Sequence, residues 1–169
     1  YSRERVLMTL PKLRVIPLGG LGEIGKNMMV LESEEDIVVI DAGIMFPSED
    51  LLGVDLIIPD ISYLLERKEK VRGILITHGH EDHTGALPYV LSRLPVPVYA
   101  PRLAHGLISV KLQEHPSSRG STIISVDPGV PVSLGSFEAE FFRVCHSIPD
   151  AMGIALRTPL GLVLHTGDF

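Results

Sequence analysis

The 169-residue sequence contains no tryptophan, and aromatic residues make up only 5% of it. An aliphatic core is therefore expected, and with 45% hydrophobic residues the chain is long enough to build the core of one domain. The single cysteine, Cys145, excludes an internal disulfide, so nothing in the sequence indicates an oxidising compartment. Because an unpaired cysteine is usually a small buried hydrophobic residue, we expect Cys145 to be buried and not to bind a metal.

Long apolar segments and an excess of basic residues are also missing. No run of ~18 apolar residues could span a membrane, and residues 1–13 lack the pattern of a signal peptide, so we expect a cytoplasmic protein without membrane association. The chain has 15 Lys and Arg against 21 Asp and Glu, a net charge of −6. This balance counts against a simple basic patch for nucleic acid, because counterion release requires clustered Lys and Arg.

The segment His78-Gly79-His80-Glu81-Asp82-His83 places four potential metal ligands within six residues, directly after an apolar run. If residues 73–77 form a buried strand, the chain leaves the sheet edge at His78. A short loop can then turn the first two histidines toward one point and the final Asp-His pair toward a neighbouring point. Imidazole and carboxylate together suit zinc. A solitary histidine is usually solvated or packed in the core, whereas this cluster predicts a hydrolytic metal site.

Two further candidates follow β-rich segments elsewhere in the chain. His146 comes after residues 139–144, and Asp168 comes after residues 161–167. Polar residues often end strands, so neither position would indicate a ligand by itself. Beside the six-residue motif, both become candidate ligands. His165 competes locally with Asp168, and we interpret it as a strand or loop residue.

Short apolar runs and helical periodicities alternate along the chain, beginning with three strands of antiparallel style. This pattern predicts an α/β protein, α+β in connectivity, with one domain at residues 13–169 after an N-terminal arm at residues 1–12. The expected strands are residues 13–18, 28–32, 37–41, 73–77, 96–100, 121–126, 130–134, 137–144, 152–158 and 162–166. The expected helices are residues 61–71, 86–94 and 103–115.

These motifs, taken in order, resemble the metallo-β-lactamase superfamily, whose hallmark is His-x-His-x-Asp-His after a strand, then a distant His and a distant Asp. Asp41, at the end of an apolar run, is similar to the superfamily's first motif, an aspartate that supports the metal loop without binding the metal. Residues 18–27, 41–47 and 77–87 together resemble the ribonuclease J family of β-CASP nucleases. The resemblance covers residues 13–169 and implies the first portion of an αββα sandwich, with mostly antiparallel or mixed sheets flanked by helices.

The resemblance also implies a ligand set. It assigns His78, His80 and His146 to a first zinc and Asp82 and His83 to a second, with Asp168 bridging the two. Asp82 and, from behind the ligands, Asp41 would serve catalysis. The family's second zinc also takes a later histidine that this chain does not contain. We therefore expect the inserted β-CASP domain and the C-terminal parts to be absent from this chain, and the chain alone to be inactive.

The activity implied is hydrolysis of RNA phosphodiester bonds by a hydroxide activated between two metal ions, zinc or alternatively manganese. The family context is RNA maturation and decay, including rRNA processing, by 5′-to-3′ exonuclease or endonuclease cleavage. The partners implied are 5′-monophosphorylated RNA and further copies of the chain, in a dimer or tetramer. Two other readings stay open: a thioester, lactone or β-lactam hydrolase of the same superfamily, and a scaffold protein without chemistry.

Two loops remain. The glycine-rich residues 19–25 precede a strand and not a helix, which argues against a phosphate-binding loop. We interpret these glycines as allowing positive φ and a close approach to the metal site or to RNA, with polar contacts from Glu23 and Asn27. The acidic loop at residues 42–60 offers carboxylate and carbonyl oxygens, so a structural calcium ion bound by Asp55 and the carbonyl of Gly53 is a further prediction.

Overall fold

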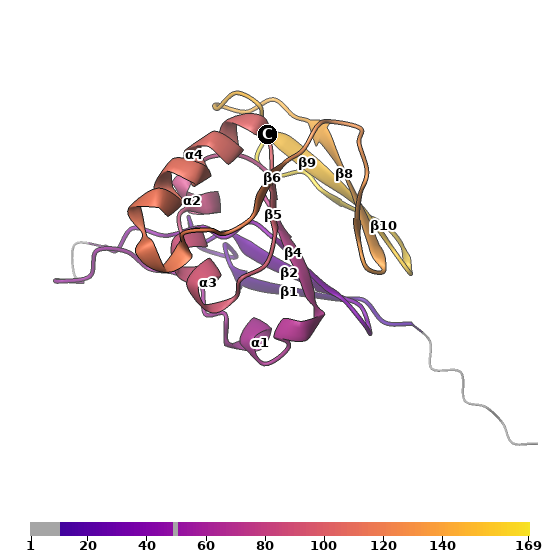
Figure 1. The fold of residues 1–169 in the computed structure, drawn as a ribbon, viewed down its shortest axis with the longest axis horizontal. Coiled ribbons are helices and arrows are strands. Elements are labelled where there is room, and N and C mark those ends of the chain that lie inside the picture. Colours follow the sequence, from indigo (N-terminus) through magenta and orange to yellow (C-terminus); the bar gives the residue numbers. More distant parts are fainter. Residues whose placement is uncertain (1–10, 49–50) are drawn as a thin grey trace, which may run out of the picture.

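The computed structural model describes residues 11–48 and 51–169, so most of the predicted N-terminal arm lies outside the described residues. In the described part the chain forms two β-sheets and one layer of helices (Figure 1). The mixed six-stranded sheet contains β1 Arg14–Gly19, β2 Met28–Glu32, β3 Ile37–Ile40, β4 Val71–Leu75, β5 Val98–Ala100 and β6 Ile123–Ser125, in that spatial order. The antiparallel four-stranded sheet contains β7 Val132–Leu134, β8 Phe137–Arg143, β9 Met152–Thr158 and β10 Gly161–His165, in the order β10-β9-β8-β7.

The helices cover one face of the six-stranded sheet, and the four-stranded sheet packs against the other face (Figure 1). They are α1 Ser62–Leu65, α2 Glu81–Thr84, α3 Leu87–Arg93 and α4 Arg102–Glu114, with short 3-10 turns at Lys68–Lys70 and Pro116–Ser118. None of the helices in residues 11–48 and 51–169 is long and apolar enough to cross a membrane. The expected α/β class is confirmed, and the layers have the arrangement of the first part of an αββα sandwich.

The order of the strands brings the candidate site to one edge of the molecule. β1, β2 and β3 are antiparallel neighbours, whereas β3 to β6 run parallel, joined by crossovers that contain the helices. β3 is buried along its whole length, as a parallel strand covered on both faces must be. Because β3 and β4 are parallel, the segments that follow them, at Asp41 and at His78, leave the sheet at the same edge.

The predicted strands and most helices agree with the structure to within two residues at each end. The exception is the predicted helix at residues 61–71, which is wrong beyond its first turn. Helix α1 ends at Leu65, a 3-10 turn follows, and Val71 already pairs with Ile37 in the sheet. The residues between carry charged side chains with no apolar face to bury, so the pairing of Val71 decides the conformation of this segment.

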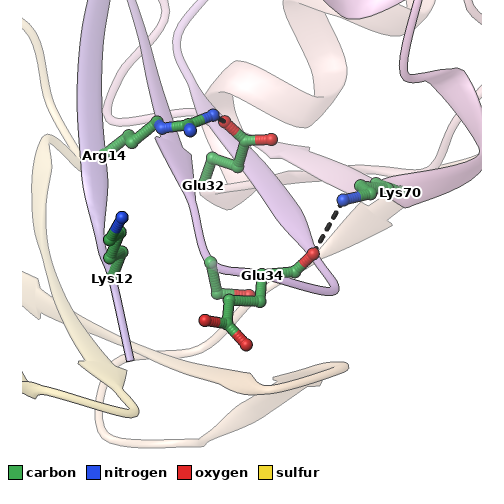
Figure 2. A pocket seen from close by; sticks show the side chains of 6 residues that line it. Lys12, Arg14, Glu32, Glu34 and Lys70 are labelled. Atoms are coloured by element: carbon green, nitrogen blue, oxygen red, sulfur yellow. Dashed lines mark hydrogen bonds and ion pairs between the residues drawn. The ribbon is translucent and has the colours of Figure 1, made fainter. Parts of the chain in front are cut away.

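A charged hollow of about 310 Å³ lies at the end of the β1–β2 hairpin where Arg14 pairs with Glu32. Figure 2 shows Arg14 directed toward the Glu32 carboxylate, at 3.2 Å, and Lys70 toward the main-chain oxygen of Glu34, at 2.7 Å. The candidate site begins at the opposite end of this hairpin, about 17 Å away along β1 at 3.3 Å per residue. The hollow is therefore separate from the candidate site. The Arg14–Glu32 ion pair and the hydrogen bond from Lys70 to Glu34 stabilise it.

The side chain of Asp36 connects three segments at the end of the sheets opposite the candidate site. Its buried carboxylate forms an ion pair with Arg72 of β4 and accepts a 2.6 Å hydrogen bond from the main-chain N–H of Ser136, between β7 and β8. Burial alone would raise the pKa of Asp36, but the Arg72 guanidinium and the Ser136 hydrogen bond outweigh it and lower the pKa below its ordinary value. The charged form of Asp36 therefore stabilises the contact between the two sheets.

This depressed pKa predicts how stability depends on pH. The stabilisation is fully present above the unfolded pKa of about 3.9 and is lost as the pH falls through the lower folded pKa. We expect Asp36→Asn to be about 1–3 kcal/mol less stable at pH 7 and to lose less stability than the wild type below pH ~4. Urea unfolding at a series of pH values measures both effects. Equal acid sensitivity of the two proteins would contradict the prediction.

Candidate metal centre

The six-residue motif begins in extended backbone after β4 and ends in a helical turn. His78 is buried, and His80 retains an extended conformation just before α2. Asp82 and His83 lie within α2, stabilised by the hydrogen bond from the Thr84 hydroxyl to the main-chain oxygen of His80. The six-residue motif, predicted to be a short loop, is thus helical in its second half. Within α2, Oδ2 of Asp82 lies 3.6 Å from Nε2 of His83, and the His83 ring packs against the His78 ring with centroids 4.1 Å apart.

The structure brings five of the six predicted zinc ligands together in two groups that share one residue, and Asp82 belongs to neither group. His78, His80 and His146 form the first group, and His78, His83 and Asp168 form the second. In each group the potential ligand atoms lie within 4.8 Å of one another. Nδ1 of His80 is 3.0 Å from Nε2 of His78 and 3.2 Å from Nε2 of His146. His146 comes from the loop after β8 and Asp168 from the segment after β10, so with the segment after β4 three separate segments meet here.

The first group has the spacing that a tetrahedral metal requires. A metal–nitrogen distance of about 2.0–2.1 Å places the ligand nitrogens of a tetrahedral site about 3.3 Å apart. The observed separations of 3.0 and 3.2 Å are close to that value. Three imidazoles suit zinc and its borderline neighbours better than a hard cation. The residues present therefore fit a transition metal.

Hydrogen bonds behind His78 determine which of its nitrogens faces the group. The Thr77 hydroxyl donates to Asp41, so it must accept from Nδ1 of His78, which lies 3.0 Å away. Nδ1 then carries the proton and Nε2 keeps a free lone pair. Burial, together with the charge of neighbouring His83, lowers the pKa of His78 to about 4. His78 is therefore neutral near pH 7, as a metal ligand must be.

Asp41 is the centre of this hydrogen-bond network. Its buried carboxylate accepts from the main-chain N–H of Thr77 at 2.8 Å, from the Thr77 hydroxyl at 2.9 Å and from Nδ1 of His83 at 2.8 Å. Asp41 has φ 61°, a left-handed conformation that Asp tolerates better than most residues and that ends β3. Asp41 thus contacts His83 directly and His78 through Thr77, from the side away from the ligand groups.

His83 is held by carboxylates on both of its ring nitrogens. Burial disfavours its charged form, but the hydrogen bond to Asp41 and the nearby carboxylates of Asp82 and Asp168 outweigh burial and raise the pKa of His83 to about 9. Its Nε2 lies 3.6 Å from Asp82 Oδ2 and 3.4 Å from Asp168 Oδ2. A cation that binds Nε2 must displace a proton, and these carboxylates favour that exchange electrostatically.

The carboxylates of Asp82 and Asp168 form the open side of the centre. Their side chains are 38% and 45% exposed, whereas His78 and His83 are almost fully buried. Oδ2 of Asp168 is 3.4 Å from His83 Nε2 and 3.7 Å from His146 Nε2, so it lies between the two groups. A hollow of about 300 Å³ adjoins this side, between the glycine-rich loop and the segment after β10. Solvent and ligands can reach the centre from here.

The segment that follows Asp41 packs directly against the motif. A Cβ on Gly43 would lie 1.5 Å from the main-chain oxygen of Asp82, so only glycine allows α2 to approach the segment after Asp41. Glu23 forms bonds within the glycine-rich loop, to the N–H of Gly20 at 3.2 Å and to Lys26 at 3.2 Å, and does not reach the centre. Asn27 does reach it, with its amide nitrogen 3.2 Å from His83 Nε2.

Two residues have outcomes that the sequence did not anticipate. Thr77 was not predicted at all; the signal for it was a threonine ending an apolar strand next to His78, fully buried in the structure. Cys145 is exposed, so its expected burial is wrong, because β8 ends at Arg143 and the loop turns Cys145 outward. Within the described residues, Asp82, Cys145, His165 and Asp55 lie outside both groups of three potential ligands.

The predicted calcium loop is described only in part. Gly53 has φ +80° with open space around it, and Asp55 is exposed. Asp50, the other acidic residue at the centre of this loop, lies outside the described residues. The calcium ion therefore stays a prediction.

The sequence and the fold define the class of protein. The family described as "Metallo-beta-lactamase superfamily" matches residues 21–169, and the chain belongs to this superfamily. The metallo-beta-lactamase fold protein YhfI from Bacillus subtilis has a similar solved structure, with a TM-score of 0.62 at 17% identity over 94% of this chain and 62% of that one. At this identity the similarity shows the fold alone.

Within the superfamily the chain is similar to ribonuclease J. It is 48% identical to ribonuclease J of Helicobacter pylori over 158 residues, which is 93% of this chain and 23% of the relative. It is 44% identical to ribonuclease J2 of Bacillus subtilis over 93% of this chain and 28% of the relative. The chain thus spans about a quarter of the length of these relatives and resembles their amino-terminal part. The resemblance inferred from three separate motifs is confirmed.

Proposed function

We propose that the protein is a metal-dependent ribonuclease that uses two zinc ions, with manganese as the alternative. The observation that carries the proposal is the pair of ligand groups sharing His78 at one open sheet edge, in a chain 44–48% identical to ribonuclease J relatives. His80 and His146 would complete the first site. Asp82 and His83 would form the second, and Asp168 would bridge the two. Residues 13–169 would then be the first portion of the catalytic domain.

When bound, the two metal ions would supply an acidified water and neutralise charge that develops on a phosphodiester. The chain's own residues would hold the ligands in place and orient the attacking water. Asp41 holds His83, and through Thr77 it holds His78, so both rings are fixed before substrate arrives. The half-exposed carboxylate of Asp82 can orient the attacking water and accept its proton at Oδ2.

The finer points of the proposal follow from the family. The substrate would be 5′-monophosphorylated RNA, cleaved from the 5′ end, internally or in both ways, in the cytoplasm during RNA maturation and decay. The protein would assemble as a dimer or tetramer, and a calcium ion bound by Gly53 and Asp55 would be structural. A second candidate is another superfamily hydrolase, of thioesters, lactones or β-lactams, since the same donor set can activate water against a carbonyl. The similarity to ribonuclease J favours RNA.

Metal removal tests the proposal. We expect the protein at its full natural length, loaded with zinc, to cleave 5′-monophosphorylated RNA and to show no thioesterase activity. Dialysis against a chelator should reduce RNA cleavage by about 10³-fold or more, and added zinc or manganese should restore it. Gel analysis of 5′-labelled RNA measures cleavage and its direction. RNA cleavage unaffected by the chelator, or rapid thioester hydrolysis without RNA cleavage, would contradict the proposal.

A further inference from the structure

Asn27 lies on the turn between β1 and β2 and is bonded through its main chain to both segments that build the centre. Its N–H donates to the main-chain oxygen of Asp82 at 3.0 Å, and its own main-chain oxygen accepts from the N–H of Gly43 at 3.0 Å. The residue before it, Lys26, donates to the main-chain oxygen of Ile44 at 2.9 Å. These bonds fix the backbone of Asn27 between α2 and the segment that follows Asp41.

The half-buried side chain of Asn27 points at the ligand atoms of α2. Its amide nitrogen donates to the main-chain oxygen of Asp82 at 3.1 Å and to Asp82 Oδ2 at 3.2 Å, and it is 3.2 Å from His83 Nε2. The amide group has two N–H donors, and the main-chain oxygen and Oδ2 of Asp82 accept them. The amide therefore fixes Oδ2 of Asp82 next to Nε2 of His83, so that both potential ligand atoms face one region.

The glycine-rich loop makes room for this side chain. A Cβ on Gly20 would lie 2.5 Å from Oδ1 of Asn27, and Gly20 has φ +86°, a conformation that favours glycine. A Cβ on Gly19 would lie 2.2 Å from the main-chain oxygen of Lys26. Both glycines thus allow the two ends of the loop to close over Asn27. This packing explains the presence of the glycines without a bound nucleotide.

We propose that Asn27 is a positioning residue that orients Asp82 and His83 for the second metal, and that Gly19 and Gly20 exist to place it. The inference rests on the proposed two-metal function. It distinguishes the two ligand groups, because in the described residues the Asn27 amide contacts Asp82 and His83 but forms no hydrogen bond with His80 or His146. Loss of the amide should therefore affect one metal and spare the other.

Metal titration of the full-length protein tests this inference. After chelation, Zn²⁺ is added back to the wild type and to Asn27→Leu, and the two dissociation constants are measured by competition with a chromophoric chelator. We expect Asn27→Leu to weaken the second metal by about 10- to 100-fold, the range for residues that support metal ligands. The first metal should change by less than about threefold. Gly20→Ala, which crowds the amide, should shift the second constant in the same direction.

Ile24→Ala is the matched control, since Ile24 lies in the same loop and is 92% exposed. It should leave both constants unchanged. If circular dichroism shows that Asn27→Leu is unfolded, Asn27→Ala takes its place in the same titration. An unchanged second constant, or equal weakening of both metals, would overturn the inference. A protein that binds two metals, shows the Asn27 effect and cleaves no RNA would overturn the proposed function and leave this inference standing.

Discussion

Replacement of His80 by alanine is expected to remove the metal of the first group and to reduce RNA cleavage by about 10³-fold or more. Nδ1 of His80 lies close to both other nitrogens of this group, at 3.0 and 3.2 Å, so its loss leaves only two imidazoles. Two nitrogen ligands do not complete a zinc site. Several kcal/mol of transition-state stabilisation then disappear with the metal, at about 1.36 kcal/mol per tenfold in rate.

The measurement is the zinc content of the purified full-length protein together with its rate of cleavage of 5′-monophosphorylated RNA. His105→Ala is the matched control, because His105 is a partly buried histidine of α4 outside both ligand groups. It should keep the wild-type zinc content and rate. A His80→Ala protein with full zinc content and an unchanged rate would rule out the catalytic metal centre.

Replacement of Asp41 is expected to cause the largest loss of stability. Asp41→Ala leaves the N–H and hydroxyl of Thr77 and Nδ1 of His83 buried without an acceptor. It also forces alanine into a left-handed conformation at φ 61°. Together these effects should lower the free energy of unfolding by about 3–5 kcal/mol. Asp41→Asn tolerates the same φ and keeps one acceptor oxygen, so its loss should be smaller, about 1–3 kcal/mol.

Urea unfolding with and without zinc measures both variants. Because His83 loses its support in both, zinc should stabilise each variant less than it stabilises the wild type. Asp127→Asn provides the control: its exposed ion pair with Arg102 should contribute less than about 1 kcal/mol. If Asp41→Ala were as stable as Asp127→Asn, the network described around Asp41 would not hold the centre together.

The segments that the sequence predicted well are those in which local pattern and burial agree. β3 and β9 are mostly buried apolar runs, and they lie at the expected positions. The helix predicted at residues 61–71 failed because periodicity is a local property, whereas the position of Val71 is decided by its pairing with Ile37, far away in the chain. Burial of Cys145 failed for a similar reason, since the direction of a loop residue depends on where its strand ends.

The sequence by itself predicted the candidate ligands, which are three histidines and an aspartate in one motif, a distant His146 and a distant Asp168, and it placed Asp41 behind them at a strand end. Residue chemistry and spacing are local, so they can be recognised without coordinates. Only the tertiary structure decided that His78 belongs to both groups, that Thr77 sets its tautomer and that Asn27 reaches Asp82 and His83. These contacts join segments brought together by the packing of two sheets, and their hydrogen-bond geometry depends on distances that no single segment contains.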